Sequence, residues 1–68
     1  MTQKELLYLE DACKHEEILL DVLDDALNNL NDDSFIEFIQ TEISIHQRLF
    51  DNLNQLLEDN ANEWSINF

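Results

Sequence analysis

The sequence has no glycine, no proline, one cysteine and only three lysine or arginine residues among 68. Without glycine it lacks the loops that cradle phosphate groups and the strained turns that carry the nucleophile of serine hydrolases. One cysteine, Cys13, excludes an internal disulfide. No run of about 20 apolar residues is present, so we expect no membrane-spanning segment.

Sixteen acidic residues against Lys4, Lys14 and Arg48 give a formal net charge of -13. Binding to a phosphate backbone needs clustered basic residues, and so does binding to an anionic membrane surface. We therefore expect neither nucleic acid nor a membrane as a direct partner. The first residues lack the charged and then apolar pattern of a signal peptide, so we predict a cytoplasmic protein with Cys13 as a free thiol.

Two capping boxes indicate where helices begin, Thr2-Gln3-Lys4-Glu5 and Ser34-Phe35-Ile36-Glu37. The segment 28–33 between them is rich in asparagine, which can take the left-handed conformation that ends many helices. The fold class that we predict is all-α, an antiparallel two-helix hairpin over residues 1–60. Its parts are a helix over 3–30, a turn over 31–34 and a helix over 35–60, followed by a C-terminal tail over 61–68.

Apolar residues recur at steps of three and four in both predicted helices and form a seam with one polar interruption on each helix. The seam positions are Leu6, Leu9, Cys13, Glu16, Leu20, Leu23, Leu27 and Leu30, and then Ile36, Ile39, Ile43, His46, Phe50, Leu53 and Leu57. Further apolar residues flank this seam: Tyr8, Ala12, Leu19, Val22, Ala26, Phe35, Phe38, Ile45, Leu49 and Leu56.

The flanking residues widen the apolar arc of each helix to about 160°, more than one neighbouring helix covers. A chain this short usually needs a disulfide, a metal or a partner copy to be stable. We therefore predict a homodimer, or a higher even oligomer, in which two hairpins form a four-helix bundle. The alternative is a monomer whose tail folds over the seam.

Three polar residues, Glu16, Glu42 and His46, fall inside the apolar arcs. One interpretation is a buried Glu16–His46 pair that fixes the alignment of the helices, with no cofactor. Another is a metal site for iron, manganese or zinc, although di-iron bundles use Glu-x-x-His and this spacing is one residue longer. A third is a solvated seam edge. We predict no catalytic residues, and a metal-dependent oxidase is the only enzymatic alternative.

Two surface features are candidates for binding a partner. Asp21, Asp24 and Asp25 belong to an acidic outer surface of the first helix, which could bind a basic protein or mimic nucleic acid phosphates. Trp64, Ile66 and Phe68 alternate with polar residues in the tail, as in a strand that docks on a partner or packs on its own bundle.

The segments Leu9–Leu19, with its His-Glu pair, and Phe35–Leu49, with a Glu followed by His-Gln, resemble the short ferritin-like proteins of spore-forming bacteria. These are small coat or coat-associated proteins. The resemblance implies a four-helix, ferritin-like architecture, a structural role and a spore-associated location. The function that we predict is a small acidic structural or interaction protein that self-associates. The alternatives are a ferritin-like metal-binding protein and an acidic inhibitor of a basic partner.

Overall fold

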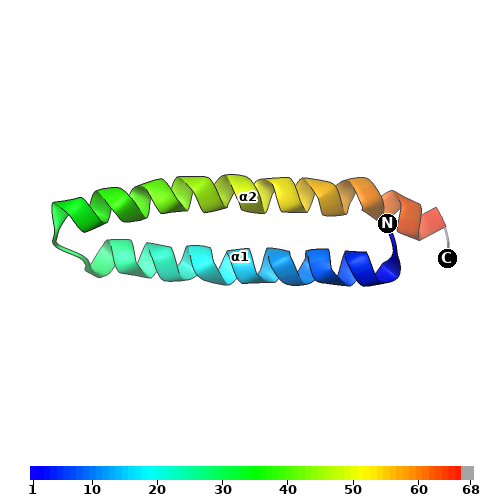
Figure 1. Cartoon of the computed structure of the whole chain (residues 1–68), viewed down its shortest axis with the longest axis horizontal. Helices are drawn as coiled ribbons and strands as arrows, with labels where there is room; N and C mark the ends of the chain where they lie inside the picture. The colour runs from blue at the N-terminus through cyan, green and yellow to red at the C-terminus, as the bar shows by residue number, and fades with distance from the viewer. Residues whose placement is uncertain (67–68) are drawn as a thin grey trace.

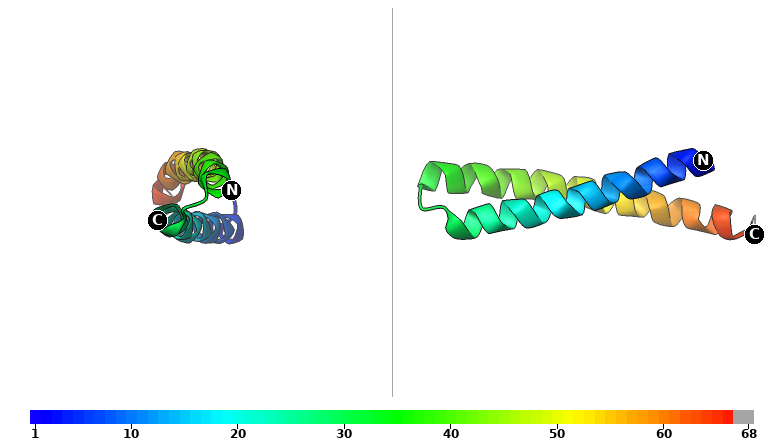
Figure 2. Two further views of the ribbon diagram at one scale, coloured as in Figure 1. Left: turned by 90° about the vertical axis from the view of Figure 1, so that its left-hand side faces the viewer. Right: turned by 90° about the horizontal axis from the view of Figure 1, so that it is seen from below.

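The computed structural model describes the backbone of residues 1–66 and the side chains of residues 1–61. It contains two helices, α1 (Gln3–Asn29) and α2 (Asp33–Ile66). The helices run side by side in opposite directions and cross at a shallow angle (Figures 1 and 2). The hairpin is a rod with principal extents of 52 × 14 × 14 Å. The prediction of an all-α helical hairpin is thus confirmed over the part of the chain that the structure describes.

The first residues of α1 are held by the predicted capping box. The Thr2 hydroxyl accepts a hydrogen bond from the Glu5 amide at 3.1 Å, and a Glu5 carboxylate oxygen accepts from the Thr2 amide at 2.9 Å. These two bonds satisfy backbone donors that have no partner within the helix. Hydrogen bonding to the Glu5 carboxylate from the Thr2 amide, and then from the Thr2 side chain, lowers the pKa of that carboxyl, because the charged form is the better acceptor.

The end of α1 differs from the prediction of a left-handed asparagine. Within the described residues no backbone φ is positive, and Leu30 ends the helix in an extended conformation with φ −94° and ψ 143°. Its amide donates to the Ala26 carbonyl, and the Asn29 side-chain amide donates to the Asp25 carbonyl at 2.7 Å. These bonds satisfy carbonyls of the last turn, so the helix can end without left-handed backbone.

The start of α2 corrects a second expectation, because Asp32 rather than Ser34 caps the helix. One Asp32 carboxylate oxygen accepts from the amides of Ser34 at 2.9 Å and Phe35 at 3.3 Å. The Asp32 carbonyl accepts from the Ile36 amide. A carboxylate at this position satisfies two free amides and interacts favourably with the positive end of the helix dipole. The helix therefore begins at Asp33, two residues before the predicted start.

At its other end α2 continues to Ile66, six residues beyond the predicted boundary. The strand-like alternation in the predicted tail does not produce a strand, because this segment continues α2. No glycine or proline interrupts the helix, and a lone strand would leave its backbone groups without the bonds that a helix supplies. The tail is therefore helical through Ile66. The side chains of Trp64, Ile66 and Phe68, which we predicted to bind a partner, lie outside the described residues.

The predicted seam lies between the two helices. Every seam residue is at least half-buried, but only Leu9 and Cys13 are buried, at 9% and 7% exposure. Burial, and then the charge of Glu10, raises the pKa of the Cys13 thiol. Cys13 is thus a small apolar core residue whose thiol loses its proton less readily than an exposed one. Among the described residues, neither helix has a stretch long and apolar enough to cross a membrane.

Candidate functional site

The apolar residues that flank the seam all lie on one side of the hairpin. Each of them directly precedes a seam residue, as Phe38 precedes Ile39 and Val22 precedes Leu23. In two antiparallel helices that face each other, the residues before the seam positions share one side and those after them share the other. We call the first side the apolar face; it comprises Tyr8, Ala12, Leu19, Val22, Ala26, Phe35, Phe38, Ile45, Leu49 and Leu56.

Seven of the ten side chains of the apolar face are exposed, from 41% for Leu49 to 63% for Tyr8. The other three, Ala12, Leu19 and Ala26, are half-buried. Only Met1, Leu7 and Ile18 are comparably exposed large apolar residues elsewhere among the described side chains. The apolar face is therefore a band along the hairpin, interrupted by His15 on α1 and by Glu42 and Asn52 on α2, and monomeric proteins rarely leave large apolar patches uncovered.

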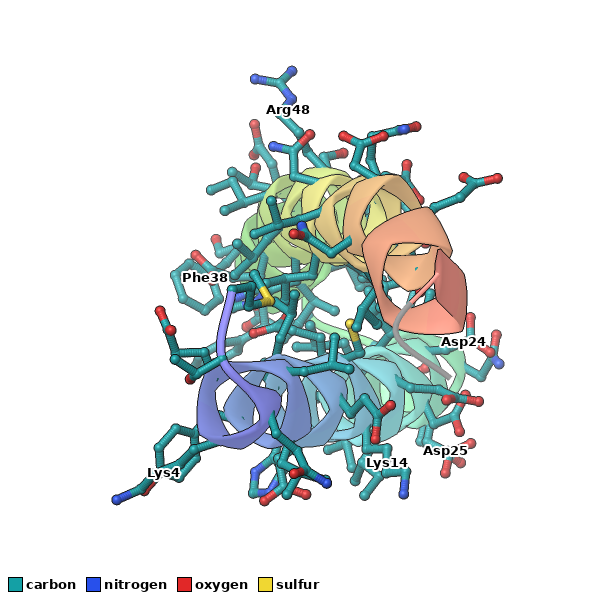
Figure 3. The ribbon with its side chains drawn as sticks, turned by 90° about the vertical axis from the view of Figure 1, so that its right-hand side faces the viewer. Lys4, Lys14, Asp24, Asp25, Phe38 and Arg48 are labelled. Carbon is teal, nitrogen blue, oxygen red and sulfur yellow. The ribbon has the colours of Figure 1, made fainter. Side chains whose placement is uncertain are left out.

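The opposite side of the hairpin is polar. Of the residues that directly follow seam positions of α1, Leu7 alone is apolar, and in α2 none is. Figure 3 shows Phe38 and Asp24 pointing to opposite sides of the rod. Asp21, Asp24 and Asp25 are all exposed, as predicted. Residues 17–45 contain no lysine, arginine or histidine, so negative charge is concentrated toward the turn.

Glu16, His46 and Glu42 meet at the middle of the hairpin, as the seam pattern predicted. His46 Nδ1 lies 2.7 Å from Glu16 Oε2 across the two helices. His46 Nε2 lies 3.5 Å from Glu42 Oε2, one turn away on α2. We call these three residues the central row. Their side chains are 16%, 23% and 31% exposed for Glu16, His46 and Glu42, so the row runs from the seam outward.

The central row is an imidazole between two carboxylates. A neutral imidazole has one N–H and could serve one carboxylate, whereas the doubly protonated ring donates on both sides. The two carboxylates approach opposite ring nitrogens and do not converge on a common point. Among the described residues no group of three or more histidine, cysteine, aspartate or glutamate side chains is arranged to hold a metal ion. Binding of iron, manganese or zinc would therefore require these side chains to rearrange.

Two features of the site were missed by sequence reasoning. The sequence analysis recognised that the apolar arc is wide. It did not recognise that the apolar residues beyond the seam lie on one side of both helices. The signal was present in the sequence, because the surplus residues precede seam residues in each helix. The cap at Asp32 was also missed, although an aspartate two residues before a predicted serine cap is an equally good candidate.

No family model, curated protein or solved structure matches the chain. The resemblance to ferritin-like spore-coat proteins and the spore location that it implies therefore stay predictions, and so does the metal site at Glu16, Glu42 and His46.

Proposed function

We propose that the protein is a structural assembly module in which two copies of the hairpin pair through their apolar faces as a four-helix bundle. The observation that carries this proposal is the one-sided apolar face. A two-helix hairpin needs only its seam to hold together. A second band of exposed leucine, isoleucine and phenylalanine side chains is favourable only where another surface covers it.

The exposed area supports this proposal quantitatively. The chain exposes 5367 Å². A compact monomer of 8.1 kDa would expose about 4,500 Å². The surplus of about 900 Å² is close to the area of about 800 Å² that each partner buries in a standard protein interface. The surplus goes with the rod shape of the hairpin, 52 × 14 × 14 Å, and is large enough to accommodate an interface of standard size.

A second copy fits this face better than a ligand or a substrate. The face is a flat band along a rod, and no pocket is present among the described residues. It is self-complementary in size, since α1 contributes the small Ala12 and Ala26 while α2 contributes Phe35, Phe38 and Leu49. Pairing of the two faces gives the layered packing of a helical bundle, with polar and acidic residues outside.

The test compares two isoleucines that differ only in the side on which they lie. Ile45 is on the apolar face at 54% exposure, and Ile18 is off it at 63%. Sedimentation equilibrium should show a dimer for the unchanged protein. Ile45→Glu should weaken association by about 100-fold or more, because a carboxylate would be buried without a partner. Ile18→Glu, which adds the same charge, should leave the dimer intact. A monomeric unchanged protein, or equal effects of the two variants, would contradict the proposal.

A second candidate function rests on the polar side of the hairpin, opposite the apolar face, which we call the acidic side. With Asp21, Asp24 and Asp25 exposed and no basic residue over 17–45, this side suits a basic protein partner. Capture of a basic protein should then weaken as salt rises and as these aspartates are changed to asparagine. Capture that neither salt nor these changes affect would exclude this function.

A further inference from the structure

The charge of the chain is almost uncompensated along its whole length. Residues 17–45 carry eight acidic side chains and no lysine, arginine or histidine, and the rest of the chain carries eight acidic side chains with three lysine or arginine residues. Among the described side chains, the only ion pairs are those of His46 with Glu16 and Glu42. Each copy therefore presents nearly its full net charge of -13 to a second copy.

Pairing through the apolar face brings two such molecules close together while most of their carboxylates stay outside the contact. The hairpin is 14 Å thick, and packed helices have axes about 8–10 Å apart, so charges of the two copies lie about 10–30 Å from one another. Figure 3 shows Asp24 on the side opposite Phe38. The acidic side thus acts on the second copy through its electric field and not through contact, and that field is repulsive.

We infer that this repulsion makes self-association depend on ionic strength, so that hairpins pair as salt rises and separate as it falls. The inference rests on the proposed self-association. The Debye length is about 30 Å at 0.01 M salt and about 8 Å at 0.15 M. At the lower concentration charges across the whole pair repel one another, and at the higher one most of these distances are screened. The attraction comes from burial of apolar surface, which screening leaves in place.

The sign of this salt dependence is the reverse of that for a basic partner. Attraction between the acidic side and a basic protein weakens as salt screens it, whereas the pairing of two like-charged hairpins strengthens. At low salt the hairpin is single, with its apolar face open and its acidic side unscreened. At higher salt it is paired. The charge of the chain is therefore a control on assembly as well as a source of solubility.

Sedimentation equilibrium of the full chain in 10 and 150 mM NaCl tests this inference. The Kd of the pair should fall about 100-fold or more between the two concentrations. Circular dichroism of the same samples should show a constant helix content, so that the change in mass reports pairing alone.

A charge variant separates repulsion from other effects of salt. Glu10, Glu17 and Glu37 are exposed and directly follow seam residues, so they belong to the acidic side. Glu10→Gln/Glu17→Gln/Glu37→Gln lowers the net charge from -13 to -10, and the repulsion, which scales with the product of the two charges, falls by about two fifths. This variant should pair about fivefold more tightly than the unchanged protein at 10 mM and nearly equally at 150 mM. The matched Glu10→Asp/Glu17→Asp/Glu37→Asp keeps the charge and should follow the unchanged protein.

A Kd that is equal at both salt concentrations would overturn the inference and leave the self-association in place. Equal salt dependence in the glutamine variant and the unchanged protein would do the same, because salt would then act through apolar burial and not through charge. A loss of helix at 10 mM that accompanies the loss of mass would assign the salt dependence to folding and would also overturn it. A monomer at both concentrations would overturn the proposed self-association itself, so the two failures are distinguishable.

Discussion

The apolar face and the acidic side are carried by the same two helices, at equal distances from the same seam, and yet their residues are of opposite character. Ten of the fifteen positions that precede the seam carry apolar residues, and the other five are Glu5, His15, Asn29, Glu42 and Asn52. Positions that follow it carry glutamate, aspartate, glutamine and asparagine, with few exceptions. The seam alone explains the hairpin. The difference between its two sides is what supports the proposed pairing through the apolar face.

The two sides also differ in the surroundings of their carboxylates. On the acidic side carboxylates are exposed and no basic side chain neutralises them over residues 17–45. On the other side the carboxylate of Glu42 lies beside His46. At 3.5 Å from His46 and 31% exposure, Glu42 is not fully paired, and its carboxylate interrupts the apolar face.

The largest effect should come from the seam that both sides share. Leu9→Ala removes one of the two buried side chains and should lower the free energy of unfolding by about 2–4 kcal/mol. The matched change Leu7→Ala, at a 58% exposed leucine on the acidic side, should cost less than about 0.5 kcal/mol. Urea unfolding followed by circular dichroism measures both. Equal costs would show that the seam does not lie where the structure places it.

A smaller effect should come from the polar centre. His46→Leu leaves the Glu16 carboxylate, 16% exposed, without its 2.7 Å partner and should cost about 1–2 kcal/mol. The double variant Glu16→Leu/His46→Leu removes both polar groups and should recover that loss or exceed the original stability. Urea unfolding followed by circular dichroism measures the stability of both variants. Failure of the double variant to recover would mean that the pair stabilises the hairpin in its own right.

The smallest effect should come from the acidic side. Changing Asp21, Asp24 and Asp25 to asparagine removes like charges that repel one another. Stability should rise by about 0.5 kcal/mol at low salt, and the gain should vanish at high salt as the charges are screened. Thermal unfolding at two salt concentrations measures this. A loss of stability at either concentration would show that these aspartates make contacts that water does not replace.

Much of the fold could be predicted because local rules and the apolar pattern agree. The Thr2–Glu5 box, the seam and the two-helix hairpin depend on neighbours in the chain and on a period of three and four residues. The bounds near the turn were predicted less well, because several asparagines and aspartates there are competing caps. Asp32 prevails over Ser34 because its charged carboxylate satisfies two amides at once. The extended end at Leu30 also depends on how α2 follows.

The amino-acid sequence by itself determined that the chain is two amphipathic helices, acidic outside, with Glu16, Glu42 and His46 among apolar residues. These properties follow from composition and period alone. The sequence also carried the signal that the surplus apolar residues share one side, because they precede seam residues in both helices. Only the tertiary structure decided that His46 lies between two carboxylates, because its contact with Glu16 depends on how one helix is rotated and aligned against the other. That arrangement is set by packing along the whole seam and not by any local segment.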